Sequence, residues 1–322
     1  SPNHSNKNWV TSQYDQMVMC DTVQKSGSDA AIIRIHNKDK AIAVSVDSSA
    51  NYCKSYPLTG GRQIVCENWR NLISVGAKPL AITNCLNFGN PENQEIMGEF
   101  AECLEGVKEA CNFLNYPVVS GNVSFYNGTN KKNIYPTPVI GGVGLIKKLS
   151  NPLSHNFKKA NSTIILIGKT FGHIEQSCFL KENYSITDGM PPEINLLNEK
   201  NNGESLLKLI DKNLILSAHD VSSGGLITAL AEMALSSDYG AKIHKPDKLT
   251  NLFKYFFGED QARYIIEIQT QHLPITEKIL RESNIYYENI GFTQENYFEI
   301  EGELKISTKD LFKINNQWYN KY

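Results

Sequence analysis

The sequence has 322 residues, of which 41% are hydrophobic and 20% charged, so its composition is that of a globular protein and excludes fibrous and disordered classes. Lysine and arginine (32) nearly balance aspartate and glutamate (34), and no basic stripe is present. Nucleic acid and acidic membrane surfaces are therefore poor partners. No apolar run approaches the roughly 20 residues that span a bilayer. These features predict a soluble, cytoplasmic protein with room for two domains.

Seven cysteines are spread through the chain, and none forms a Cys-x-x-Cys pair. An odd number at irregular spacing indicates free thiols in a reducing compartment, and argues against a disulfide framework or a zinc site. The sequence begins at Ser1 and not at Met, which suggests a piece of a longer protein.

The first half of the chain alternates short apolar runs with helical patterns. The strongest helical pattern repeats apolar residues at 3-4 spacing over five turns, and glycines within the last strand indicate close backbone approach. In chain order, the predicted elements are a strand at 30–35, a strand at 41–46, a helix from Gly60 to Gly76, a strand at 80–86, a helix at 97–114, a short buried strand at 118–119 and a strand at 138–146.

A polar stretch with Pro152, at 147–160, predicts a boundary between a first domain at 1–150 and a second at 151–322. Strands and helices occur on both sides of it, which predicts two α/β or α+β domains. In chain order, the predicted elements of the second are a strand at 163–167, a loop-rich stretch to Pro192, a helix at 204–212, a strand at 214–218, a helix at 225–235, a strand at 264–268, a helix at 276–282 and a strand at 286–291.

Two loops that follow strands carry candidate ligand contacts. The segment 84–91 (NCLNFGNP) is rich in asparagines, which tolerate tight turns and both donate and accept hydrogen bonds. In the segment 120–124 (SGNVS), Gly121 permits close approach to a phosphate, Asn122 offers an amide oxygen to Mg²⁺ and Ser124 can bind an anion. Taken alone, the first segment is more typical of a plain turn, and the second is equally compatible with one. Two such loops in one domain are expected to lie close together, where α/β proteins often bind ligands.

Two familiar nucleotide motifs are incomplete. Gly168-Lys169-Thr170 ends like a P-loop, but position 163 is Thr where the first glycine is required. Gly142-Val143-Gly144 begins like a dinucleotide fingerprint, but position 147 is Lys in place of the third glycine. We therefore exclude both.

Two further segments have an open interpretation. The run 219–225 (HDVSSGG) joins a strand to a helix, and its serines and glycines suit a helix N-terminus that binds an anion. An acid–base role for His219 with Asp220 is conceivable, but a hydrogen-bonded loop histidine is favoured. The run 258–263 (GEDQAR) suits either an exposed turn or one wall of a cleft.

These segments, taken together and in this order, resemble the C-terminal half of the synthetase subunit of the phosphoribosylformylglycinamidine synthase family. The similarity extends from about Trp9 to about Thr293, and the combination of CLNFGNP, SGNVS and YPTPVIG is close to diagnostic. The matching stretches are GSDAAIIRI (27–35), GGRQIVCENWRNLISVGAKPLAITNCLNFGNPE (60–92), PVVSGNVSFYN (117–127), IYPTPVIGGVGLI (134–146), SAHDVSSGGLITALAEMAL (217–235) and FGEDQARY (257–264).

The resemblance implies an aminoimidazole ribonucleotide synthetase-like A domain (1–150) followed by an α+β B domain (151–322). In this superfamily the A-domain sheets of two halves pair into a barrel, with nucleotide sites at the junction. The implied reaction converts formylglycinamide ribonucleotide, ATP and ammonia into the amidine, ADP and phosphate, with Mg²⁺ positioning the phosphates. The implied partners are the N-terminal half, a glutaminase subunit that supplies ammonia and a small accessory subunit.

Carried over by the motifs, the nucleotide contacts fall at Asn84 and Gly121, the Mg²⁺ ligand at Asn122 and the substrate contact at Ser124. Asn84 departs from the aspartate usual in the family, which weakens its assignment. The family's catalytic histidines and most acidic metal ligands lie in the preceding half, and none of the seven histidines here occupies the corresponding motif. We therefore assign no catalytic residue to this chain.

Three hypotheses follow. The first is a C-terminal half that completes the synthetase site but is inactive alone. The second is a non-catalytic module that pairs with the first half and holds nucleotide for stability. The third is a self-sufficient, homodimeric ATP-dependent relative. The absence of the family's catalytic histidines argues against it, as does the motif Gly27-Ser28-Asp29, where Gly-Asp-Asp is expected. The first two predict an apolar sheet face through which an isolated half dimerises or aggregates.

Overall fold

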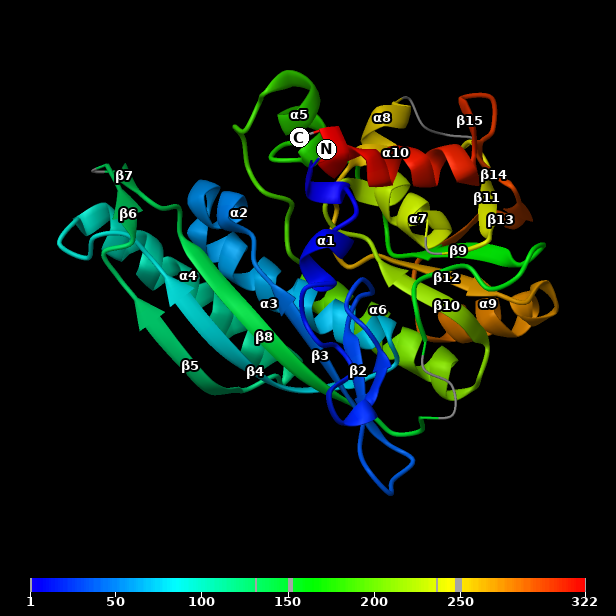
Figure 1. Cartoon of the computed structure of the whole chain (residues 1–322), viewed down its shortest axis with the longest axis horizontal. Helices are drawn as coiled ribbons and strands as arrows, with labels where there is room; N and C mark the ends of the chain where they lie inside the picture. The colour runs from blue at the N-terminus through cyan, green and yellow to red at the C-terminus, as the bar shows by residue number, and fades with distance from the viewer. Residues whose placement is uncertain (1, 131, 150–152, 236, 247–250, 322) are drawn as a thin grey trace.

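The computed structural model describes residues 2–130, 132–149, 153–235, 237–246 and 251–321. It contains a six-stranded sheet from the first half of the chain and a seven-stranded sheet from the second, each packed against helices (Figure 1). A two-stranded hairpin, β6 (Gly128–Thr129) and β7 (Lys132–Asn133), stands apart from both sheets. The mixed α and β architecture expected from the sequence is thus confirmed.

The six-stranded sheet has the order β1-β2-β3-β8-β4-β5, in which only β4 and β5 pair in parallel. Helices cover one face of it. Ala43 and Ile140 are fully buried on that face, whereas Ile42 and Val143 on the opposite face are 37% and 38% exposed. The elements are β1 (Thr22–Gln24), β2 (Ala31–Arg34), β3 (Ala41–Asp47), α2 (Ala50–Ser55), α3 (Pro57–Ser74), β4 (Lys78–Asn87), α4 (Gln94–Leu114), β5 (Val118–Ser124) and β8 (Thr137–Ile146).

Local sequence explains the bounds of the two long helices. Pro57 lies in the first turn of α3, where its missing N–H costs no hydrogen bond. Asn93 caps α4 by accepting a hydrogen bond from the Glu95 backbone N–H at 2.9 Å. Asn115 ends α4 in the left-handed conformation, at φ 52°.

The seven-stranded sheet has the order β10-β12-β9-β13-β11-β14-β15. Its central strands β9 and β12 are buried on both faces, because α6 and α9 pack on one face and α7 and α8 on the other (Figure 1). The elements are β9 (Thr163–Ile167), α6 (Leu196–Asp211), β10 (Ile215–Asp220), α7 (Gly225–Leu235), β11 (Tyr239–Ile243), α8 (Leu252–Phe257), β12 (Tyr264–Ile268), α9 (Leu273–Glu282), β13 (Tyr287–Glu295), β14 (Tyr297–Ile300) and β15 (Leu304–Ser307).

The two ends of the chain lie side by side (Figure 1). Near the N-terminus, the Asn6 side chain donates to the Asn316 side chain at 2.7 Å, and Asn315 donates to the His4 carbonyl at 2.8 Å. No helix in the described ranges combines the length and apolar character needed to cross a membrane. The remaining elements are the short helices η1 (Pro2–His4), α1 (Asn8–Thr11), η2 (Val18–Cys20), α5 (Cys178–Tyr184) and η3 (Thr270–His272), and the terminal α10 (Thr308–Lys321).

Several predicted bounds were wrong. The strand predicted as buried at 118–119 is an exposed edge strand that continues to Ser124, with Val119 70% exposed. The predicted strand at 80–86 extends to Asn87, and the predicted loop residues 120–124 are paired strand residues. The predicted loop to Pro192 contains α5, and α6 begins eight residues before the predicted 204 because Asn195 caps it.

Arg70 of α3 links the two halves of the chain. Its guanidinium is fully buried and donates to Glu199 at 2.7 Å, to Gln261 at 2.9 Å and to Asp220 at 3.4 Å, all from the second half. Burial opposes the charge, but Glu199 and Asp220 outweigh it and raise the pKa of Arg70. The hydrophobic core is continuous across the same junction, from Ile73 of α3 into α6.

We predict that Arg70→Met lowers the free energy of unfolding by about 3–5 kcal/mol, because it leaves two buried carboxylates without a counter-charge. The matched control is Arg62→Met, which removes a partly exposed pair with Glu109 and should cost about 1 kcal/mol or less. Denaturant unfolding measures both. Equal losses in the two variants would contradict a structural role for the buried network.

Candidate nucleotide site at the edge of the first sheet

The four residues predicted to contact ligands lie on two neighbouring strands. β4 and β5 pair in parallel, with Asn84 opposite Gly121 and Asn87 opposite Ser124, and Asn122 lies between these positions. The structure therefore brings the predicted residues to one edge of the sheet. It does so within the strands, because the β4–β5 pairing includes all of 120–124 and continues along β4 to Asn87.

The strands divide these side chains between the two faces of the sheet. Asn84 pairs with Ile140, which is fully buried under the helices, so Asn84 and the opposite Gly121 lie on the helix-covered face. Side chains alternate along a strand, which places Asn122 and Ser124 on the uncovered face. A ligand that meets all four positions must therefore reach around the edge strand.

Gly121 allows close contact between the two strands. A Cβ at this position would lie 1.9 Å from Asn84 Oδ1 and 3.0 Å from the Asn84 carbonyl oxygen. β5 is also the last strand in the sheet order, so its outer edge presents backbone groups without a neighbouring strand. The Gly121 backbone is exposed there, which suits close approach by a phosphate.

Asn122 and Ser124 differ in how firmly they are held. In the described part of the chain, the exposed Asn122 side chain has no hydrogen-bond partner. Asn127 Nδ2 donates to Ser124 Oγ at 3.1 Å and also to the Phe88 carbonyl at 3.0 Å, so it orients the serine. Sequence reasoning missed Asn127, although its position three residues after Ser124 in an Asn-rich segment was a usable signal.

The donor set at this edge suits only part of a Mg²⁺ site. Mg²⁺ prefers six oxygen ligands, usually including carboxylates, phosphates and water. Neither β4 nor β5 contains an acidic residue, and Asn122 offers one neutral amide oxygen. The edge thus fits one ligand of an ion whose other ligands come from outside these strands.

A second polar cluster surrounds His219, which is the penultimate residue of β10 and not part of a loop as predicted. His219 Nδ1 lies 2.6 Å from Asp29 Oδ1, and Nε2 lies 3.2 Å from Glu232 Oε2. Burial alone would lower the pKa of His219, but Asp29 and Glu232 raise it well above its ordinary value. His219 is therefore charged and paired with these two carboxylates. One ligand atom each from Asp29, His219 and Asp220 lies within 4.8 Å of the others, close enough to share a cation.

His155 packs beside this cluster, with its ring centroid 5.1 Å from that of His219. Burial, and then the neighbouring charged His219, lowers the pKa of His155 to about 4. Its Nδ1 lies 3.0 Å from Ser28 Oγ. The two adjacent histidines therefore carry different charges at neutral pH.

The segment 258–263 is buried, so it is neither an exposed turn nor a cleft wall. Glu259 accepts a hydrogen bond from the Tyr52 hydroxyl at 2.6 Å and others from the backbone N–H groups of Gly224 and Cys178. Asp260 accepts from three successive backbone N–H groups, at 171–173. These acids satisfy buried donors, which is a structural role.

Comparison with known families matches the two halves separately. The family model described as AIR synthase related protein, N-terminal domain, matches residues 27–146, and the one described as AIR synthase related protein, C-terminal domain, matches residues 159–300. The chain belongs to the AIR synthase related family. This membership is consistent with the two separate sheets, one in each matched region, and with the resemblance noted in the sequence.

Within the AIR synthase related family, the chain is similar to proteins named phosphoribosylformylglycinamidine synthase subunit PurL. It is 54% identical to that of Pelagibacter ubique (strain HTCC1062) over 322 residues, and 42% identical to that of Bradyrhizobium diazoefficiens over 323. Each alignment covers 100% of this chain and 44% of the relative. The chain therefore spans less than half the length of the curated relatives it matches.

Solved structures share the fold. PurL of T. maritima complexed with AMPPCP has a TM-score of 0.63 and 25% identity, over 90% of this chain and 42% of that one. T. maritima PurL complexed with FGAR has a TM-score of 0.73 at 16% identity, over 88% of this chain and 47% of that one.

We predict that Gly121→Ala lowers the free energy of unfolding by about 1–3 kcal/mol, because the added methyl group overlaps Asn84. Asn84→Ala in the same chain removes the nearest overlapping atom and should recover part of the loss. Thermal unfolding measures the three variants. Gly98→Ala is the matched control, since a Cβ at this helical glycine meets nothing within 4 Å. A neutral Gly121→Ala would show that the strands separate easily.

We also predict that His155 makes the free energy of unfolding depend on pH. Between pH 6.5 and 4 the unfolded chain binds a proton at this residue and the folded chain does not, so stability falls as the pH falls. The loss amounts to about 2–3 kcal/mol. In denaturant unfolding at several pH values, His155→Asn should lose less stability over this range than the parent protein. His244→Asn, at an exposed histidine 3.5 Å from Glu301, is the control substitution. If the free energy of unfolding changed with pH equally in His155→Asn and in the parent protein, the lowered pKa of His155 would be contradicted.

Proposed function

We propose that this chain is the C-terminal half of a phosphoribosylformylglycinamidine synthase and contributes one side of a synthetase site that a second half completes. The observation that carries the proposal is 54% identity to a PurL subunit over the whole chain, aligned with 44% of that subunit. The likeness to a PurL structure in complex with the ATP analogue AMPPCP supports a nucleotide site within this fold.

The uncovered sheet face supports a paired arrangement. Ile42, Val46 and Val143 project from this face and are 37%, 67% and 38% exposed, while the opposite face is packed against helices. An apolar surface of this kind is typical of an interface. The proposed occupant is the corresponding sheet of the N-terminal half, as the family resemblance implies.

In this proposal the edge of β4 and β5 binds and orients the reactants. The Gly121 backbone and the Asn84 side chain contact the nucleotide, and Ser124, held by Asn127, contacts formylglycinamide ribonucleotide. Asn122 supplies one oxygen ligand to Mg²⁺, an ion that neutralises phosphate charge when bound. Acid–base groups and the remaining metal ligands come from the N-terminal half. A glutaminase subunit, with a small accessory subunit, delivers the ammonia.

The alternatives make different use of the same edge. A nucleotide-holding module would bind ATP here without taking part in turnover. A self-sufficient homodimer would draw its acid–base groups from this chain, where the ion-paired His219 and Asp220 are the first candidates to mutate.

We predict no ADP release when this chain alone is given ATP, Mg²⁺, formylglycinamide ribonucleotide and ammonium, and turnover once a separately produced N-terminal half is added. Asn122→Ala should lower the restored rate by at least about tenfold, because a metal ligand is lost. Asn201→Ala, an exposed change on α6, is the control.

Turnover by the chain alone would overturn the proposal in favour of a homodimer. Failure of the N-terminal half to restore turnover, with ATP still bound, would favour the nucleotide-holding module.

A further inference from the structure

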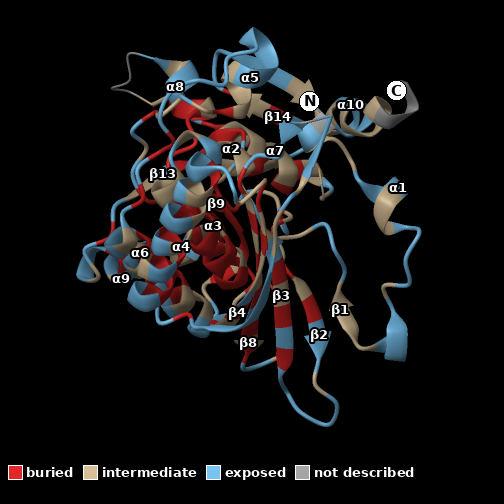
Figure 2. Cartoon of the chain, turned by 90° about the vertical axis from the view of Figure 1, so that its left-hand side faces the viewer, coloured by how far each residue is buried: buried red, intermediate tan, exposed pale blue. Residues whose placement is uncertain are grey.

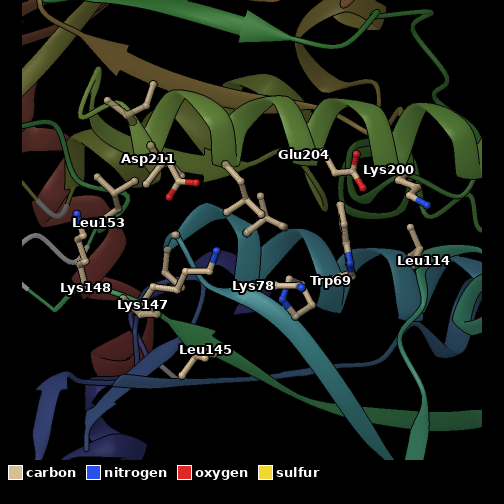
Figure 3. A pocket seen from close by; sticks show the side chains of 18 of the residues that line it. Trp69, Lys78, Leu114, Leu145, Lys147, Lys148, Leu153, Lys200, Glu204 and Asp211 are labelled. Carbon is tan, nitrogen blue, oxygen red and sulfur yellow. The ribbon is translucent and has the colours of Figure 1, made fainter. Parts of the chain in front are cut away.

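A cavity of about 600 Å³ lies between the two halves of the chain, where the first sheet meets α6 (Figure 3). Its walls come from the end of α3, the start of β4, the end of β8 and one side of α6. A volume of this order accommodates small organic ligands. The cavity adjoins Lys78, the first residue of β4, whereas Asn84 lies six residues along that strand, about 20 Å away. It is therefore separate from the proposed nucleotide site.

The charged lining of the cavity has an excess of positive charge. Four lysines contribute to it, Lys78, Lys147, Lys148 and Lys200, against two carboxylates, Glu204 and Asp211. Figure 3 shows Lys147, Lys148 and Asp211 at one end and Lys200 with Glu204 at the other. Among the described residues, Lys78, Lys147 and Lys148 have no ion-pair partner. Neighbouring ammonium groups repel one another, and a bound anion relieves that repulsion.

The middle of the cavity is lined by apolar side chains, including a tryptophan. Trp69 is only 5% exposed and lines the cavity with Ile73, Leu207 and Ile210. Its ring is fixed against α6, because a Cβ at Gly203 would lie 2.2 Å from Trp69 Cζ3. The indole of Trp69 also offers an N–H hydrogen-bond donor in this wall of the cavity.

We propose that this cavity binds a phosphate monoester of nucleotide size. The ammonium groups of Lys78, Lys147 and Lys148 receive the phosphate, as lysines commonly do. The apolar wall receives the flat ring. The Trp69 N–H and the Glu204 carboxylate serve polar atoms of the base and the sugar. This assignment does not depend on the proposed synthetase function.

The test measures binding of AMP to the whole chain by calorimetry, at low ionic strength and with EDTA present. Low salt limits screening, and EDTA suppresses any Mg²⁺-dependent nucleotide binding at β4 and β5. We expect saturable binding at one site. Inorganic phosphate alone and adenosine alone should each bind at least about tenfold more weakly than AMP, because each meets only part of the lining. Phosphate binding as tightly as AMP would overturn the assignment, as would no binding of AMP.

Charge reversal locates the site. Lys147→Glu with Lys148→Glu should weaken AMP binding by at least about tenfold. The control is Lys208→Glu on α6, an exposed lysine outside the cavity. Asn84→Ala should leave AMP binding unchanged, since it alters only the edge of β4 and β5. Trp69→Phe should weaken binding while circular dichroism reports an intact fold. AMP binding that survives the double reversal, or that is lost in Asn84→Ala, would overturn the proposal.

Discussion

The structure depends on a fully buried arginine. Arg70 leaves the helix layer of the first sheet and is neutralised by side chains 129 and 150 residues further along the chain. A charge removed from water is tolerated only when its partners are held in place, so α3, α6 and β10 must assemble together. The Tyr52–Glu259 hydrogen bond, which spans 207 residues, adds a second polar link across the same junction. Neither half of the chain satisfies these groups by itself.

The two sheets differ in how completely they are covered, and this asymmetry is consistent with the proposed role of each. The second sheet has helices on both faces, so its central strands β9 and β12 are uniformly buried. The first has helices on one face only (Figure 2), and its edge strand β5 is exposed along nearly its whole length. The predicted ligand contacts all belong to the incomplete sheet. The surface proposed to bind a partner and the site proposed to need further groups thus occur in the same sheet.

Sequence patterns located the buried elements well and the exposed ones poorly. Thr163–Ile167 and Tyr264–Ile268 were predicted with their observed bounds, since a short run of apolar residues between polar ones has few other structures. The segment 118–124 failed because its register depends on β4, a strand distant in sequence, and its glycine and asparagine are also typical turn residues. For the same reason His219 was assigned to a loop. Its place in a strand depends on pairing with Ile265 of β12, and its ion pair is with the distant Asp29, neither of which a local pattern reveals. The two polar segments and the family resemblance together supplied the candidate site residues, and the strand register placed these residues at one edge of the sheet.

The adjacent chain ends have a consequence for how the protein can be connected. Asn6 and Asn316 are in direct contact, so a segment that precedes the first helix and one that follows the last would both attach beside α10. A short peptide could join the two ends without disturbing the fold, and new ends could then be opened in the turn between β2 and β3. Such a circular permutant would keep both sheets and the buried arginine network while moving the point of attachment to the opposite end of the molecule (Figure 1).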